Sequence, residues 1–146
     1  MINLLEQTKL DRVNAAVSAG QTTVNSDVVD MLGFDSCLFA VLLGDVTDTS
    51  VVKLTIQHGD QSNGSDMADT TISTSYTAGA SDADNNMLAA EINRPLKRYV
   101  RAKVERNTAN AEVDGVLAQL ANPDEAPTSH ADDLLSDAFD YSPASA

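Results

Sequence analysis

The stretch "VVKLTIQHG", residues 51–59, decides the fold class. Val52, Leu54 and Ile56 alternate with polar residues, which is the period of a strand that has one face on a core and the other in water. The chain around it therefore has to supply further strands that complete a sheet and a second apolar layer.

The run just upstream, "CLFAVLLG" at residues 37–44, is apolar without alternation. Such a run predicts a central strand that is covered on both faces. The residues between the two runs, "GDVTDTS" at 44–50, are rich in turn formers. They predict that the two runs pair as antiparallel neighbours across a short loop.

The downstream chain contains further strand patterns between polar loops. Residues 59–86 are rich in turn formers and contain one plausible strand, "TTISTSY" at 70–76, which we expect at a sheet edge. Residues 99–104 alternate in the same way as 51–59. After a turn that begins at Asn107, residues 112–120 predict a last strand with Val116, Ala118 and Leu120 facing inward.

The two ends of the chain differ from this middle region. Residues 12–31 have helical spacing in part, but they also fit two short strands joined at Gly20, and we favour strands. Residues 122–146 carry three prolines and six carboxylates without Lys or Arg, a composition that cannot close a core alone.

The whole chain is therefore predicted to be all-β, with a single β-sandwich or jelly-roll domain. We divide it into an N-terminal segment at 1–28 that forms an arm or the first strands, a β-sandwich core at 29–121, and an acidic C-terminal arm or tail at 122–146.

The charge balance limits the partners. The formal net charge is -13, with 22 acidic and 9 basic residues, which opposes binding to nucleic acid or to an anionic membrane. The longest apolar run is too short to span a bilayer, and no secretory signal is evident at the N-terminus. The lone Cys37 excludes an internal disulfide and is expected to be a buried structural thiol, so we expect assembly in a reducing cytoplasm.

No pattern of residues predicts catalysis, a metal or a cofactor. The two histidines, His58 and His130, are far apart in the sequence, and zinc sites usually gather three or four ligands. Carboxylates at residues 60–66 and 82–86 suggest an irregular Ca²⁺ site, but the stretch at 82–86 does not match an EF-hand loop, and Asp, Asn and Ser are also ordinary turn residues. We expect a protein that is not an enzyme.

The most unusual segment is "RPLKRYVRAKVER", residues 94–106, which we call the cationic strip because it holds six of the nine basic residues. One interpretation is a solvated strand face that offsets nearby carboxylates. The other is a surface that binds an acidic partner: the chain's own tail, a neighbouring subunit or a larger assembly. Under the second interpretation the partner-binding residues are Arg94, Lys97, Arg98, Tyr99, Arg101 and Lys103 of the strip, with Leu134, Leu135, Phe139 and Tyr141 as an apolar docking surface on the tail.

Three stretches together carry a family resemblance: "VDMLGFDSCLFAVLLGDVTD" (29–48), "VVKLTIQHGDQSNGSDMADTT" (51–71) and "NRPLKRYVRAKVERNTANAEVDGVLAQL" (93–120). The set resembles small virion proteins of tailed bacteriophages and prophages that are described as head decoration or capsid-stabilising (cement) proteins. The resemblance implies a non-enzymatic β-sandwich subunit, commonly a homotrimer. Such a subunit is assembled in the bacterial cytoplasm, binds the major capsid protein on the outer surface of the head, and stabilises the head.

Two alternatives remain at this stage. Another virion component, such as a tail, head-completion or receptor-binding jelly roll, shares the same strand pattern. A carbohydrate-binding or Ca²⁺-dependent module would need an aromatic platform, and the chain has no Trp and only Tyr76, Tyr99 and Tyr141.

Overall fold

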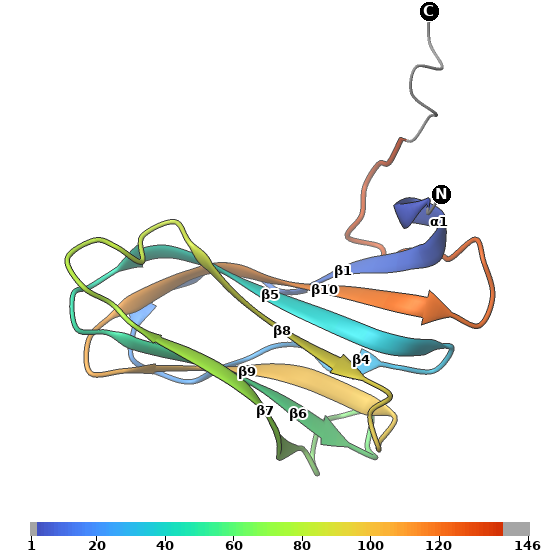
Figure 1. Ribbon diagram of the computed structural model, residues 1–146, viewed down its shortest axis with the longest axis horizontal. Coiled ribbons are helices and arrows are strands. Elements are labelled where there is room, and N and C mark those ends of the chain that lie inside the picture. The colour runs from blue at the N-terminus through green and yellow to red at the C-terminus, as the bar shows by residue number, and fades with distance from the viewer. Residues whose placement is uncertain (1–2, 139–146) are drawn as a thin grey trace, which may run out of the picture.

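Alternating burial runs along the longer strands of the computed structural model, which describes residues 3–138. In β6 (Val51–Gly59) the side chains of Val52, Leu54 and Ile56 are buried in the core. These strands form two antiparallel sheets that lie face to face, as Figure 1 shows. The predicted all-β sandwich is confirmed.

The first sheet, sheet A, has the strand order β1-β10-β5-β8, and β2 also pairs with β10. Its strands are β1 (Thr8–Asn14), β2 (Val17–Gly20), β5 (Phe34–Val46), β8 (Met87–Asn93) and β10 (Ala111–Pro123). A short helix, α1 (Leu4–Gln7), precedes β1.

The second sheet, sheet B, has the order β3-β9-β6-β7, and β4 also pairs with β9. In addition to β6, its strands are β3 (Val24–Asn25), β4 (Val29–Asp30), β7 (Ala68–Thr77) and β9 (Tyr99–Asn107). If β1 with β2, and β3 with β4, each count as one interrupted strand, the connections are those of an eight-stranded jelly roll.

The predicted hairpin between residues 37–44 and 51–59 is wrong. The first run lies in β5, which pairs with β10 and β8, whereas the second lies in β6, which pairs with β7 and β9. The turn between them crosses from one sheet to the other and is anchored by the buried Ser50, whose hydroxyl donates to the carbonyl of Ala109. Turn-forming residues predict that the chain reverses direction, but they do not predict which sheet the next strand joins. Here the two strands join opposite sheets, and the apolar face of each strand packs against the other sheet.

The prediction that 37–44 is covered on both faces is also wrong. Cys37, Phe39 and Val41 are buried in the core, but Leu38 and Ala40, on the outer face of sheet A, are only half-buried. The strand is central because β10 and β8 flank it, and only one of its faces is covered by the opposite sheet.

The other strand predictions differ mainly in extent. The predicted edge strand at 70–76 is β7, which lies at the edge of sheet B. The last strand is longer than predicted, because β10 continues to Pro123. Strand β8 was missed because "MLAAEIN" has small and charged residues rather than a clear apolar alternation.

Residues near both termini take part in this architecture. Strands β1 and β2 pair with β10, and β3 pairs with β9. No helix among the described residues is long and apolar enough to cross a membrane.

Candidate functional site

The cationic strip occupies the β8–β9 connection and strand β9, at the surface of sheet B. Val100 and Val104 are fully buried, whereas Arg101 and Lys103 lie on the opposite face of the strand and are half-buried. The alternation therefore places the cationic side chains outward.

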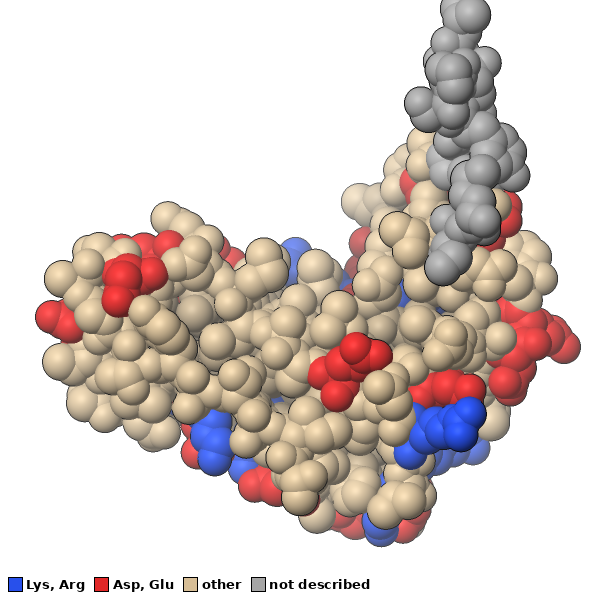
Figure 2. Space-filling model, viewed as in Figure 1, with Lys and Arg blue, Asp and Glu red and all other residues tan. Residues whose placement is uncertain are grey.

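Two cations at the start of the strip are paired with acidic residues of the same chain. Lys97 Nζ lies 2.8 Å from Asp60 Oδ2, and the Arg98 guanidinium donates two 2.8 Å hydrogen bonds to Asp30. The Arg98 bonds hold the pKa of Asp30 below its ordinary value. Arg98 also lies over the ring of Tyr99, 5.2 Å from its centroid. Figure 2 shows Lys and Arg side chains beside Asp and Glu side chains at this end of the molecule.

The middle of the strip belongs to a polar network that crosses three strands. Arg101 Nε donates to Gln57 Oε1 at 2.7 Å, and Gln57 Nε2 donates to Asp69 at 2.8 Å. Lys103 Nζ donates to both carboxylate oxygens of Asp69 and lies 3.4 Å from Glu105. The Lys103 hydrogen bond lowers the pKa of Asp69 and raises that of Lys103. This favours the interpretation that the strip offsets carboxylates of its own sheet.

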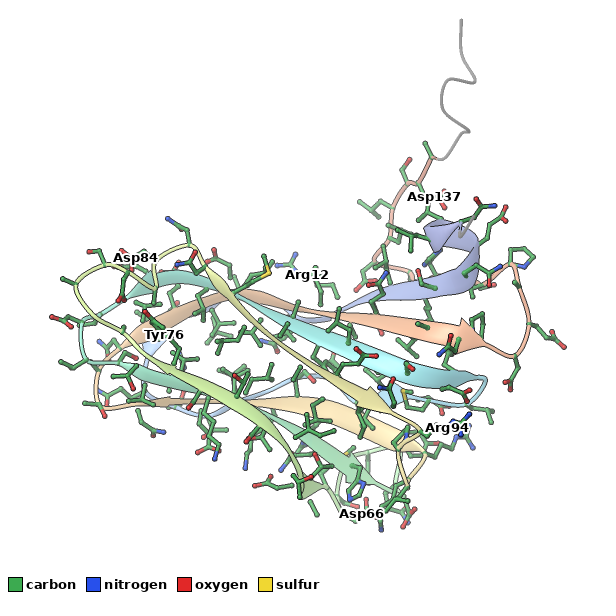
Figure 3. All side chains as sticks on the ribbon, viewed as in Figure 1. Arg12, Asp66, Tyr76, Asp84, Arg94 and Asp137 are labelled. Atoms are coloured by element: carbon green, nitrogen blue, oxygen red, sulfur yellow. The ribbon has the colours of Figure 1, made fainter. Side chains whose placement is uncertain are left out.

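Arg94 differs from these residues. Among residues 3–138, no salt bridge includes Arg94, and its side chain is exposed. Its backbone has φ +50° and its N–H donates to the carbonyl of Asp35 at 2.6 Å. Figure 3 labels Arg94 at the end of the sandwich where β8 leads into β9.

Two exposed leucines accompany Arg94 at this end. Leu32 is 69% exposed and Leu96 is 91% exposed, and both line, with Arg94, a shallow cleft of about 460 Å³. We call Leu32, Arg94 and Leu96 the end cluster. The two leucines were not among the predicted site residues, although a leucine between Pro95 and Lys97 in a turn was the available signal.

The tail residues are not brought to the cationic strip. Leu134 is half-buried and Leu135 is 95% exposed, on a segment that runs beside β1 of sheet A. Figure 1 shows that segment rising from the end of sheet A, away from sheet B. The other two predicted tail residues, Phe139 and Tyr141, lie outside the described residues. Within residues 3–138, none of the carboxylates that pair with the strip belongs to the tail. They are Asp30 of β4, Asp60 of the loop after β6, Asp69 of β7 and Glu105 of β9 itself.

His130 and Cys37 both have structural environments. His130 accepts a 2.9 Å hydrogen bond from the Leu10 N–H through Nδ1, and its Nε2 lies 2.8 Å from the Leu5 carbonyl. Cys37 is buried, and desolvation raises the pKa of its thiol to about 12. The thiolate needed for nucleophilic chemistry is therefore strongly disfavoured.

The loop carboxylates that suggested a Ca²⁺ site accept hydrogen bonds within their own turns. Asp66 accepts from the N–H groups of Asp60 and Gln61, and Asp82 accepts from Gly79 N–H and from the Tyr76 hydroxyl. Asp84 accepts from the Val46 N–H. No three His, Cys, Asp or Glu residues in the described part of the chain gather in a way that would hold a metal ion.

Comparisons with known proteins do not assign this chain to a family. No family model matches the chain, and no curated protein matches it. Among solved structures, Eiger TNF from S. frugiperda is similar with a TM-score of 0.35 and 10% sequence identity, over 81% of this chain and 99% of that one.

Proposed function

We propose that this chain is a non-enzymatic structural protein of a phage virion, which binds the outer surface of the head and stabilises it. The proposal rests on the resemblance of residues 29–48, 51–71 and 93–120 to head decoration proteins. The partner is the major capsid protein, the location is the outside of the virion, and the subunits associate as a homotrimer.

The observation that carries the proposal is the end cluster. It combines two leucines that are mostly exposed with an arginine that no described carboxylate neutralises. Arginine is enriched at protein interfaces, and apolar side chains gathered in one exposed patch mark interaction sites. The cluster is also held on a fixed base, because Met31 N–H donates to the Arg98 carbonyl and Arg94 N–H donates to Asp35.

The net charge of -13 suits this role. A negative surface keeps unassembled subunits apart. Docking to the capsid is then favoured through local cationic or apolar patches such as the end cluster. On a shell, many such contacts act together, so each one can be weak while attachment remains tight.

The test uses heads assembled without this protein, to which purified protein is added. Leu96→Asp and Arg94→Glu should each weaken binding about tenfold or more, because a tenfold change corresponds to about 1.4 kcal/mol. Lys53→Glu is the matched control, since Lys53 is an exposed cation of β6 outside the cluster and should bind normally. Thermal unfolding of every variant shows whether the fold is intact.

The rest of the strip is tested by Arg101→Glu combined with Lys103→Glu. We expect this pair to reduce binding to heads more than it reduces folding stability. Unchanged binding would show that the paired strip only offsets Asp69 and its neighbours. Cryo-microscopy of decorated particles then locates the protein: density over the whole head supports the proposal, and density at one vertex or on the tail refutes it.

A further inference from the structure

The edge of sheet B that strand β7 forms, which we call the β7 edge, is open. Strand β7 pairs with β6 on one side, and no strand among residues 3–138 pairs with it on the other. The edge strand β1 of sheet A differs, because the C-terminal segment lies along it. There the Leu10 N–H donates to His130 and the Arg12 N–H donates to Asp133.

The register of β7 shows which of its backbone groups point out of the sheet. Just beyond the strand, the Ala78 N–H donates to the Ser50 carbonyl, and the residues that bond to a neighbouring strand alternate along an antiparallel pair. Thr74 and Tyr76 therefore direct their N–H and C=O groups to β6. The intervening residues direct theirs outward, and all of them are exposed: Ser73, Ser75 and Thr77.

An open strand edge can pair with other chains, and proteins usually protect such an edge with lysine, proline or a covering segment. Residues 73–77 contain no charged residue and no proline. Along the whole of β7 the one charged residue is Asp69, which pairs with Lys103. Figure 1 shows β7 on the near side of sheet B, and Figure 2 shows mainly uncharged side chains there. The β7 edge is therefore suited to pair with an extended segment.

A cleft beside the first half of β7 limits the side chains that such a segment can have. The cleft has a volume of about 410 Å³ and lies between residues 69–72 of β7 and residues 92–96. Ile72 and Leu96 give it apolar walls, and Leu96 is 91% exposed. An extended segment that continues along β7 past Ile72 meets this cleft and can bury an apolar side chain in it.

Arg94 lines the same cleft and determines the charge that the segment needs there. No salt bridge among residues 3–138 includes Arg94. Asp69 also lines the cleft, but both of its carboxylate oxygens accept hydrogen bonds from Lys103. The guanidinium of Arg94 is suited to bind a carboxylate of a partner in a planar, paired geometry. A segment that fits the cleft therefore combines an apolar side chain with a nearby carboxylate.

The charge of the chain favours a different protein over a second copy as the source of this segment. Two copies with a net charge of -13 repel each other over their whole surfaces. A second β7 strand also has only one carboxylate, Asp69, and Lys103 already binds it. An extended segment of another protein can bring a carboxylate to Arg94 along an edge that carries no charge at residues 73–77.

We infer that the β7 edge binds an extended segment of a partner protein as an added strand, with an apolar side chain of that segment in the cleft and a carboxylate beside Arg94. The outward backbone groups of β7 supply the hydrogen bonds, and the cleft supplies the selectivity for side chains. The inference rests on the proposed function only for the identity of the partner, the capsid protein.

The first experiment selects binders from a library of random peptides of strand length, with the purified protein as the target. The recovered peptides should share an acidic residue close to an apolar one. Ser75→Pro removes the central outward N–H and should weaken their binding about tenfold or more, while the pairing with β6 is retained because proline is tolerated at such a position of an edge strand. Ser75→Ala keeps this N–H and is the matched control.

Hydrogen exchange gives a second measurement that does not depend on a variant. With a recovered peptide at about ten times its dissociation constant, the outward amides of Ser73, Ser75 and Thr77 should exchange about tenfold more slowly. The amides of Thr74 and Tyr76 should change little, since β6 already binds them.

The third experiment reverses the charge in the cleft. Arg94→Glu should weaken binding of a recovered peptide about tenfold, and lysine in place of the shared acidic residue of the peptide should restore binding to this variant. Arg94 is exposed, so the fold is retained.

Several results would overturn the inference. These are a library that yields no binder, recovered peptides that bind Ser75→Pro as well as Ser75→Ala, unchanged exchange at the outward amides, or a charge reversal without rescue. A molar mass that rises with concentration for the wild-type protein, but not for Ser75→Pro, would assign the β7 edge to a second copy instead.

Binding to heads separates this inference from the proposed function. Heads that bind Ser75→Pro normally and lose Leu96→Asp would leave the proposed function standing and exclude the β7 edge from it. Heads that do not bind the wild-type protein would refute the proposed function, and the peptide experiments would still decide whether the β7 edge accepts an added strand.

Discussion

Arg106 is the one basic residue of the cationic strip that is buried, with 2% of its surface exposed. Its guanidinium donates to the carbonyls of Ser18, Thr22 and Ala111 at 2.7–2.9 Å and to the Thr22 hydroxyl at 2.8 Å. Desolvation lowers its pKa, and the acceptors of its hydrogen bonds are backbone carbonyls and a hydroxyl rather than a carboxylate. The side chain therefore ties the β2–β3 connection to the start of β10.

We predict that Arg106→Ala lowers the free energy of unfolding by about 3 kcal/mol. The substitution removes four hydrogen bonds and leaves a cavity next to the buried Ala111 carbonyl. Urea unfolding followed by circular dichroism measures the change. Arg98→Ala is the control, because its exposed pair with Asp30 should contribute less than about 1 kcal/mol. Equal midpoints for the two variants would contradict the structural role of Arg106.

Asp11 provides a second test at the residue scale. Burial, followed by the negative charge of Asp133, raises the pKa of Asp11 above its ordinary 3.8. The folded state therefore binds this proton more tightly than the unfolded state does, so stability falls as pH rises from about 3.8 through the folded-state pKa. The full penalty is present at neutral pH.

We expect Asp11→Asn to raise the melting temperature at pH 7, and the gain should shrink as the pH is lowered toward the ordinary carboxyl range. Asp132→Asn removes the same charge from an exposed position and serves as the control. Thermal unfolding across this pH range gives the answer. A gain that is independent of pH, or equal in both variants, would contradict the explanation.

At the scale of elements, the C-terminal segment covers the edge of sheet A that strand β1 forms. Thr128 N–H donates to the Glu6 carbonyl, and the Leu10 N–H donates to His130. Arg12 N–H donates to Asp133, so alternate amides of β1 have partners. An uncovered strand edge invites pairing with other chains, and this segment protects β1 from such pairing.

This arrangement predicts different results for two truncations. Removal of residues 134–146 should leave stability within about 0.5 kcal/mol of the full chain, whereas removal of 124–146 should lower it by about 2 kcal/mol while the shortened domain still unfolds cooperatively. Calorimetry measures both changes. If both truncations behave alike, residues 128–133 do not hold the β1 edge.

At the scale of the whole molecule, self-repulsion opposes the compact state. The charge of -13 is only partly offset by the described ion pairs, which are partly exposed to solvent and contribute little each. Raising NaCl from about 10 mM to about 150 mM shortens the screening length from roughly 30 Å to 8 Å. We expect the melting temperature at pH 7 to rise by about 3 °C.

Near pH 4.2, where the chain has almost no net charge, the same addition of salt should have little effect. Differential scanning fluorimetry at both pH values makes the comparison. A salt-induced loss of stability at pH 7 would show that the ion pairs on sheet B outweigh the net repulsion.

The sequence by itself determined the fold class and the inward faces of the main strands. Alternation at Val52, Leu54 and Ile56 and at Val100 and Val104 is a local property, because successive side chains of a strand point to opposite faces. The outward direction of Arg101 and Lys103 follows from the same period.

Only the tertiary structure decided which strands are neighbours and which charges meet. Strands β5 and β6 follow each other in the chain but lie in different sheets, and Lys103 meets Asp69, which is 34 residues away. The burial of Arg106 among carbonyls depends equally on contacts between distant segments. The physical reason is that periodicity orients a side chain relative to its own strand, whereas its partner is chosen when the sheets assemble around a shared core.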